Sequence, residues 1–284
     1  FAGSQDADET YYALPLEERT VHGAPYIDRT SYSNWTAMMA GALAIAAWAT
    51  DDDALAAEAS QTLDTLHDRV RDHEGLLYHF VEAGSAPQIR GLLTDQAAYL
   101  RALLDAHEYA GEERFFDRAV ELAEALHVRF GAPDGGYYDH AALQGELGAL
   151  QFRDRPLELN CSIAESFMRL SLLLHEERWR ERAESTLLLY TKSSENAGLF
   201  AAPYGRAVRR YVSGNANVEL VGTTQETADL REAAHRLPDP LIAVRTIAED
   251  GRKGPAAYVC AGTTCAAPVS DAAELRAAYD SVAL

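Results

Sequence analysis

The sequence predicts a mainly α-helical fold of repeated helical hairpins, followed by a small C-terminal α/β subdomain. Three features predict it. Polar residues that open apolar helical patterns recur at Asn34, Asp95 and Asn160. Glycines that open short extended pieces recur at nearly the same spacing, at Gly75, Gly136 and Gly198. Beyond about residue 213 this period ends and short β-branched runs take its place.

Each repeat is expected to hold two helices and a turn. The polar residue indicates a capped helix start, and a second helix follows with an alanine in register, at Ala59, Ala119 and Ala183. The first helix is the more apolar, which predicts an inner layer, whereas 53–71 and 113–129 carry a charged, outer face. Because one hairpin cannot bury its apolar face alone, neighbouring hairpins must stack or close into a ring. We assign residues 1–212 to these repeats.

Residues 213–284 are expected to form the α/β subdomain. Strands are predicted at 218–222, 241–247 and 256–260, and helices at 224–235 and 271–282.

Three cysteines are too few for a disulfide scaffold. Cys161 lies in a helical pattern and is expected in the core. Cys260 and Cys265 flank a turn that could bring their sulfurs together, and two alternatives stay open: buried inert thiols, or a redox pair. The tail supplies no further thiolate or imidazole for zinc, so no metal site is predicted.

The chain has 284 residues, 48% of them hydrophobic, which is enough for one or two domains. Its net charge of -19 disfavours binding to nucleic acid or to an anionic membrane, and 37–49 is too short to span a bilayer. With few lysines beside many arginines, the acidic composition resembles that of salt-adapted cytosolic proteins, such as those of a haloarchaeon. We therefore expect a cytoplasmic protein.

Several motifs carry a family resemblance over nearly the whole chain. The tail AAYVCAGTTCAAPV, together with SQDAD, the Asn34-Trp35 helix start, PDGGYYD and 153–160 in that order, resembles the spermatogenesis-associated protein 20 type of thioredoxin-domain-containing proteins. The resemblance implies an N-terminal thioredoxin-like domain and an (α/α)6 toroid related to six-hairpin glycosidases and N-acylglucosamine 2-epimerases. This chain would hold an incomplete toroid, with the missing hairpins and the thioredoxin-like domain upstream. Its expected partner is that upstream part or another copy of the chain.

In such a ring, the loops at one end of the inner helices converge on a central funnel. Helix N-termini there offer free N–H groups and partial positive charge. Asn34, Asp95 and Asn160 would surround the mouth of the funnel, although each also fits a simple N-cap. Trp35 would suit stacking on a sugar, although an aromatic residue in a first turn also fits a core.

Acidic and imidazole side chains supply the candidates for chemistry. Asp6 and Asp8 share a face of an extended segment, and a raised pKa on one of them would give the acid and base pair of a glycosidase; the alternative is a solvated acidic loop. His22 and His79 lie between helices, where an epimerase would need a base.

These residues give two open interpretations of function. The catalytic candidates are Asp6, Asp8 and Asp95, and the substrate-binding candidates are Asn34, Trp35, His22, His79 and Asn160. No phosphate loop or nucleophile elbow occurs, so no cofactor is expected. The first interpretation is a funnel that binds or processes a carbohydrate, as an isomerase, epimerase or hydrolase. The second is a non-catalytic interaction module that serves a thioredoxin-like partner domain.

Overall fold

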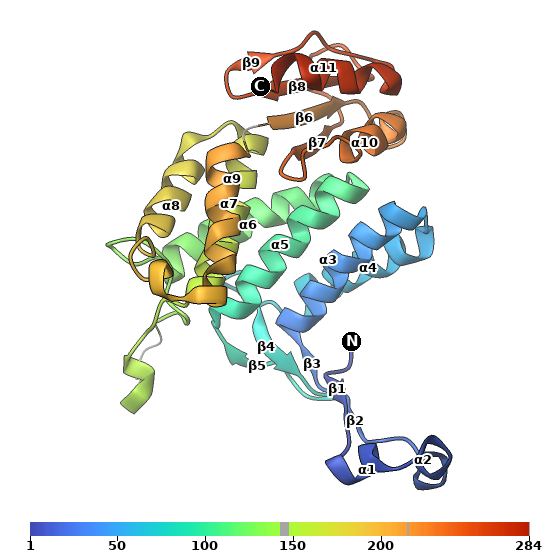
Figure 1. Ribbon diagram of the computed structural model, residues 1–284, viewed down its shortest axis with the longest axis vertical. Helices are drawn as coiled ribbons and strands as arrows, with labels where there is room; N and C mark the ends of the chain where they lie inside the picture. Colours follow the sequence, from blue (N-terminus) through green and yellow to red (C-terminus); the bar gives the residue numbers. More distant parts are fainter. Residues whose placement is uncertain (143–147, 215, 284) are drawn as a thin grey trace.

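A computed structural model describes residues 1–142, 148–214 and 216–283, and it confirms the row of helical hairpins (Figure 1). Within these residues the first helix of each hairpin packs against the first helix of the next, and α9 continues the row beside α7. The fold is therefore the expected mainly α-helical, incomplete α/α toroid. The hairpins are α3 (Ser33–Thr50) with α4 (Asp53–Thr65), α5 (Leu93–Ala110) with α6 (Glu113–Phe130), and α7 (Leu157–Leu174) with α8 (Glu177–Leu188), and α9 spans Ala202–Ser213.

The inner row is α3, α5, α7 and α9, and helix α5 lies buried in its middle. Gly41 of α3 allows a close approach to α5, because a Cβ there would lie 3.3 Å from the Ala102 Cα. The outer helices have the charged faces that the sequence predicts, and α6 buries only its apolar stripe, which includes Phe115, Ala119 and Leu126.

A small antiparallel sheet covers the N-terminal ends of α3 and α5. It has the order β3-β4-β5, with β3 (Ser31–Tyr32), β4 (Tyr78–Val81) and β5 (Gln88–Arg90). A π-helical turn, η1 (Leu66–Val70), leads from α4 toward it. The sheet therefore places the side chains of β4 next to the first turns of two inner helices.

Residues before α3 form an extension at the lower end of Figure 1. Strand β1 (Ser4–Gln5) pairs with β2 (Ile27–Asp28), and between them lie α1 (Glu9–Ala13) and α2 (Leu16–His22). Neither short helix has a buried residue, so the extension adds nothing to the core.

Two local expectations are wrong. Helices α3, α5 and α7 begin before their polar residues, so Asn34, Asp95 and Asn160 lie inside the first turn and make no N-cap. Their side chains bond to other segments of the chain instead, as described below. The extended piece predicted after Gly198 is a 3₁₀ turn, Gly198–Ala201, that runs into α9, because Pro203 favours a helix start.

The predicted C-terminal α/β elements are confirmed. The sheet order is β7-β6-β8-β9, and the only parallel neighbours among the described strands of this sheet are β6 and β7. The elements are β6 (Ala216–Val221), α10 (Ala228–His235), β7 (Ala243–Ile247), β8 (Ala256–Ala261), β9 (Thr264–Cys265) and α11 (Leu275–Val282). They enclose a second hydrophobic cluster that includes Val218, Val244 and Leu275.

This subdomain lies over the C-terminal ends of α5 and α7 (Figure 1). Arg245 of β7 donates to the Leu173 carbonyl oxygen at 2.9 Å, where a helix end favours a cation. His235 donates to the Glu108 carbonyl oxygen at 2.8 Å, and its ring stacks on Tyr109 with centroids 4.2 Å apart. These contacts fix the segment after α10 against the inner row.

The cysteines divide as a core residue and a bonded pair. Cys161 is buried and free, as predicted. Cys260 and Cys265 form a disulfide between β8 and β9, and Cys265 is exposed. The expectation of two buried, inert thiols is therefore wrong, because the two-residue turn at Gly262 and Thr263 brings the strands into register with the sulfurs adjacent. The redox role stays a prediction.

Across the parts of the chain that are described, none of the helices combines the length and the apolar character that crossing a membrane would require.

The buried imidazole of His107 on α5 predicts an acid-sensitive fold. Its Nδ1–H donates to the Glu112 carbonyl oxygen, and burial lowers its pKa to about 3. The unfolded chain binds this proton near pH 6.5 and the folded chain does not, so stability is lost as the pH falls below 6.5. Between pH 7 and 5 this group should lower the free energy of unfolding by about 2 kcal/mol.

Denaturant unfolding at both pH values should show this loss in the native protein and a smaller loss in His107→Gln. An equal loss in both proteins would contradict the assignment.

Candidate functional site

Asp95 joins three of the candidate residues at the mouth of the inner row. Its side chain is fully buried in the first turn of α5. Oδ1 accepts a hydrogen bond from the Asn34 backbone N–H at 3.1 Å, and both carboxylate oxygens lie 3.1 Å from His79 Nδ1. The side chain of His79, on β4, is 23% exposed. The sheet and two helices thus hold an imidazole against a buried carboxyl group.

The electrostatics of this pair suit proton transfer. Burial raises the pKa of Asp95 to about 6, and the hydrogen bonds from His79 and Asn34 only partly oppose this shift. A carboxyl group beneath a partly exposed histidine fixes the ring and its tautomer, as in other carboxylate–histidine pairs. His79 is therefore the member that a ligand could reach, and Asp95 is a positioning residue.

An aromatic surface lies beside the pair. Trp35 is 52% exposed, and its ring centroid is 4.9 Å from that of Tyr32, which in turn lies 5.6 Å from the His79 ring. Helical spacing puts Trp35 on the same face of α3 as Met38 and Ile45. Because Ile45 lines a pocket farther along the inner row, this face of α3 leads from the mouth to that pocket.

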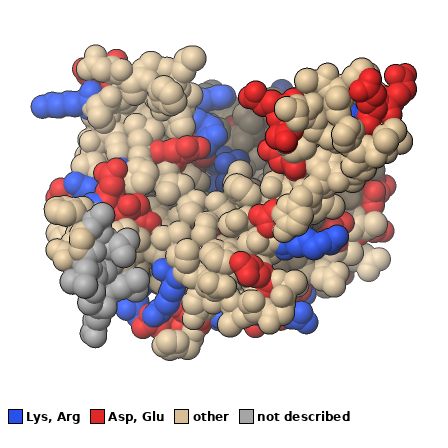
Figure 2. Space-filling model, turned by 90° about the horizontal axis from the view of Figure 1, so that it is seen from below, with Lys and Arg blue, Asp and Glu red and all other residues tan. Residues whose placement is uncertain are grey.

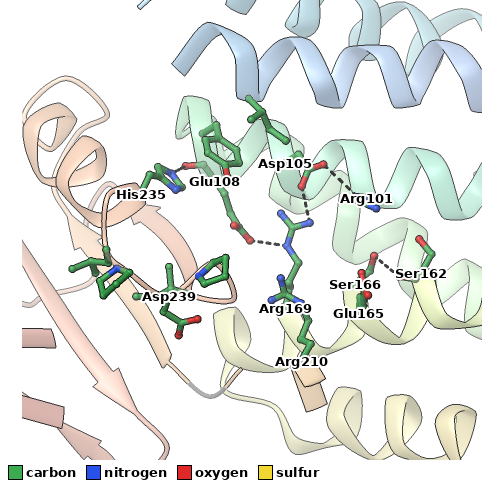
Figure 3. Close-up of a pocket in the computed structure, with 16 residues that line it drawn as sticks. Arg101, Asp105, Glu108, Ser162, Glu165, Ser166, Arg169, Arg210, His235 and Asp239 are labelled. Atoms are coloured by element: carbon green, nitrogen blue, oxygen red, sulfur yellow. Dashed lines mark hydrogen bonds and ion pairs between the residues drawn. The ribbon is translucent and has the colours of Figure 1, made fainter. Parts of the chain in front are cut away.

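The pocket lies on the concave side of the inner helices and has a volume of about 460 Å³ (Figure 3). Helices α3, α5, α7 and α9 supply three walls, and the segment 235–242 of the C-terminal subdomain closes another side. Its charged and imidazole lining residues are Arg101, Asp105, Glu108, Glu165, Arg169, Arg210, His235 and Asp239. Figure 2 shows the molecule from the end that carries β3, β4 and β5, where the surface is hollowed between a basic and an acidic side.

A buried ion-pair network forms one wall of the pocket. Arg169 of α7 donates from Nη1 to Asp105 and from Nε to Glu108, each at 2.8 Å (Figure 3). Burial raises the pKa of Glu108, while Arg169 opposes that shift. Removing one partner of such a network leaves a buried charge without compensation, so the three side chains fix one another in place.

The other predicted site residues lie apart from this surface. Asp6 accepts from the Tyr12 hydroxyl at 2.7 Å, and Asp8 is the N-cap of α1. These hydrogen bonds lower the pKa of both carboxyl groups, so the raised pKa expected for one of them is wrong. His22 is exposed at the end of α2. The structure brings none of the three into contact with Asp95 or His79.

Asn160 has a backbone-bonding role. Its Oδ1 accepts from the Tyr137 N–H at 2.7 Å, and its amide nitrogen donates to the carbonyl oxygens of Tyr137 and Pro156. Gln96 makes the same pair of bonds to Leu77 in the preceding repeat. The residue that recurs with Asn160 is therefore Gln96, one position after Asp95, and the amide of Asn160 has no free donor for a ligand.

Sequence reasoning missed the pocket lining, although a signal for it exists. Arg101, Asp105 and Glu108 recur at helical spacing in an otherwise apolar α5, and Arg169 interrupts an apolar stretch of α7. Charged side chains on the most buried helices of a repeat indicate a shared polar face. Within the described residues, no group of three or more His, Cys, Asp or Glu is arranged to hold a metal ion.

Comparisons with known proteins agree on the fold. No family model matches the sequence. An uncharacterised protein of Caenorhabditis elegans is 22% identical, and the match covers 92% of this chain but only 39% of that protein's length. Cellobiose 2-epimerase from Bacillus thermoamylovorans is 18% identical with a TM-score of 0.50, over 57% of this chain and 44% of that one. A family 76 α-mannanase from Bacteroides thetaiotaomicron is 14% identical with a TM-score of 0.54, over 78% and 64%.

The raised pKa of Asp95 gives a testable pH dependence. The unfolded side chain ionises near pH 3.8 and the folded one near 6, so stability falls as the pH rises through that window. Asp95→Asn removes this ionisation and keeps an acceptor for the Asn34 N–H. Relative to the native protein, the variant should gain about 2 kcal/mol in free energy of unfolding between pH 4 and 7.

Denaturant unfolding at the two pH values measures this difference. Asp95→Ala removes the acceptor as well and should be destabilised relative to Asp95→Asn at both. A constant difference between native protein and Asp95→Asn would show that Asp95 does not ionise in this window.

Proposed function

We propose that this chain supplies part of a carbohydrate-processing α/α toroid whose concave face binds a sugar. The polar pocket on the inner helices carries the proposal. Hydroxyl groups of a sugar need donors and acceptors at fixed positions, and Arg101, Asp105 and Ser162 offer both kinds there. The exposed ring of Trp35 offers an apolar face for a pyranose at the mouth. The similar solved structures named above, an epimerase and a mannanase, act on carbohydrates and support the proposal.

Within this proposal, His79 exchanges a proton with the sugar and Asp95 orients it. Such a pair suits an epimerase or isomerase, which removes a proton beside a carbonyl group. A glycosidase instead needs two carboxyl groups on either side of the scissile bond, and Asp95 is fully buried against His79. Asp6 and Asp8 have no role here, because local hydrogen bonds occupy their carboxylates.

Proton exchange in D₂O tests the proposed chemistry. Incubation of the chain, and of the longer protein that contains it, with D-glucose, D-mannose or cellobiose should introduce deuterium at C2 of one sugar, followed by proton NMR. His79→Gln should abolish the exchange, and Trp35→Ala should raise the KM by about tenfold through lost stacking.

Met39→Ala, another exposed apolar residue of α3, is the matched control and should leave KM unchanged. Absence of both exchange and sugar binding, measured by thermal shift on the longer protein, would reject a carbohydrate function.

One observation favours the second interpretation, an interaction module. Trp35, Met38 and Met39 expose about half or more of their surfaces on α3, at the open end of the inner row. Every other inner helix up to α7 has an inner neighbour on each side. We propose that another helical hairpin covers this face, supplied by the upstream part of the same protein or by a second copy. A thioredoxin-like partner domain would belong to that upstream part.

Self-association of the chain alone tests the open face. Light scattering should show a concentration-dependent mass, and Met38→Glu should reduce it because a charge disfavours the apolar contact. Val128→Glu makes the same change at an exposed site on α6 and should have no effect. A monomer at all concentrations would contradict a second copy as the occupant.

A further inference from the structure

Arg210 is a cation on the pocket wall without an ion-pair partner. It lies on α9, half-buried, and its guanidinium group is close to that of Arg169 (Figure 3). Among the described residues no carboxylate lies within 4.0 Å of its nitrogen atoms, and its side chain makes one hydrogen bond, from Nη1 to the Leu241 carbonyl oxygen at 3.0 Å. Burial and the charge of Arg169 lower the pKa of this guanidinium group.

The acidic side chains around Arg210 are already engaged elsewhere. Asp105 and Glu108 bond to Arg169, and Asp105 also lies 3.8 Å from Arg101. Glu165 pairs with Arg206 at 2.6 Å. Asp239 accepts from the Leu241 N–H at 2.9 Å. The donors of Arg210 therefore have no competing anion in the protein.

Physical chemistry gives this arrangement a direction. A guanidinium group has five N–H donors in a rigid fork, and four of them remain for another acceptor. Holding two cations side by side in a partly desolvated pocket is unfavourable unless an anion offsets their charge. Carboxylate and phosphate oxygens match the fork in a bidentate geometry.

We propose that the pocket binds an anionic group, the carboxylate or phosphate of an acidic sugar, on Arg210. This inference rests on the proposed function, because it names the class of sugar that the funnel takes. Arg210 binds the charged group, and the hydroxyl groups of the ring face the polar side chains of α5 and α7. Arg101, half-exposed on the pocket wall, is a second cation on the same side chain network.

Calorimetric titration of the chain tests the proposal with four probes: D-glucuronate, D-glucose 6-phosphate, D-glucose and inorganic phosphate. At least one charged sugar should bind about tenfold or more tightly than D-glucose, as expected for a charge-assisted hydrogen bond. The preferred one identifies a carboxylate or a phosphate as the recognised group. Its affinity should fall with added KCl, whereas that of D-glucose should not.

Arg210→Gln should reduce the affinity for the charged sugar to that for D-glucose. Arg209→Gln removes the neighbouring, exposed arginine of α9 and should change nothing. Arg210→Lys keeps the charge without the fork and should retain part of the preference. If Arg210→Gln does not fold, this lysine variant and the salt dependence still decide the matter.

The outcomes separate the two proposals. Equal affinity for charged and neutral sugars, or a preference that survives in Arg210→Gln, overturns the anion site and leaves the carbohydrate function standing. Binding of inorganic phosphate that depends on Arg210, with no contribution from any sugar ring, keeps the anion site and rejects the carbohydrate function. Binding of no probe overturns both.

Discussion

The structure depends on the packing of one inner helix against the next. Helix α5 can bury residues on nearly its whole circumference because α3, α6 and α7 surround it and the C-terminal subdomain covers its end. Gly41 sets how closely α3 approaches, since a side chain there would meet the Ala102 backbone and the Asp105 carboxylate. The same contact thus fixes the core and the position of an acidic group in the pocket. A repeat protein of this kind forms its functional surface from the residues that the row leaves uncovered.

Two ends of the inner helices have different tasks. At the C-terminal ends, Arg245 and His235 bond to helix carbonyl oxygens, and the α/β subdomain closes one side of the pocket. At the N-terminal ends, the β3-β4-β5 sheet holds His79 against Asp95 and leaves Trp35 exposed. A ligand in the funnel would therefore approach from the sheet end, along the exposed face of α3.

The hairpins and the C-terminal strands could be predicted because they follow from hydrophobic periodicity and turn residues. The contact between Asp95 and His79 could be expected only as a shared location, because the two residues are 16 positions apart and meet through a strand. Asn160 shows where pattern alone fails: an amide in a first turn resembles a cap, but a buried backbone segment at Tyr137 needed its donors and acceptor more. Asp6 and Asp8 looked like a catalytic pair, yet local hydrogen bonds satisfy them in an exposed extension.

The pocket was hidden from periodicity for a physical reason. An inner helix reads as apolar because most of its circumference meets other helices, and a single polar stripe is diluted in that average. Charged residues persist on such a helix only where partners compensate them, as Asp105 and Glu108 are compensated by Arg169 from the next hairpin. These interhelical pairs lie 61 and 64 positions apart, close to the repeat length itself. A search for opposite charges one repeat apart on the apolar helices would therefore find the funnel wall from sequence, because stacked repeats bring such positions into contact.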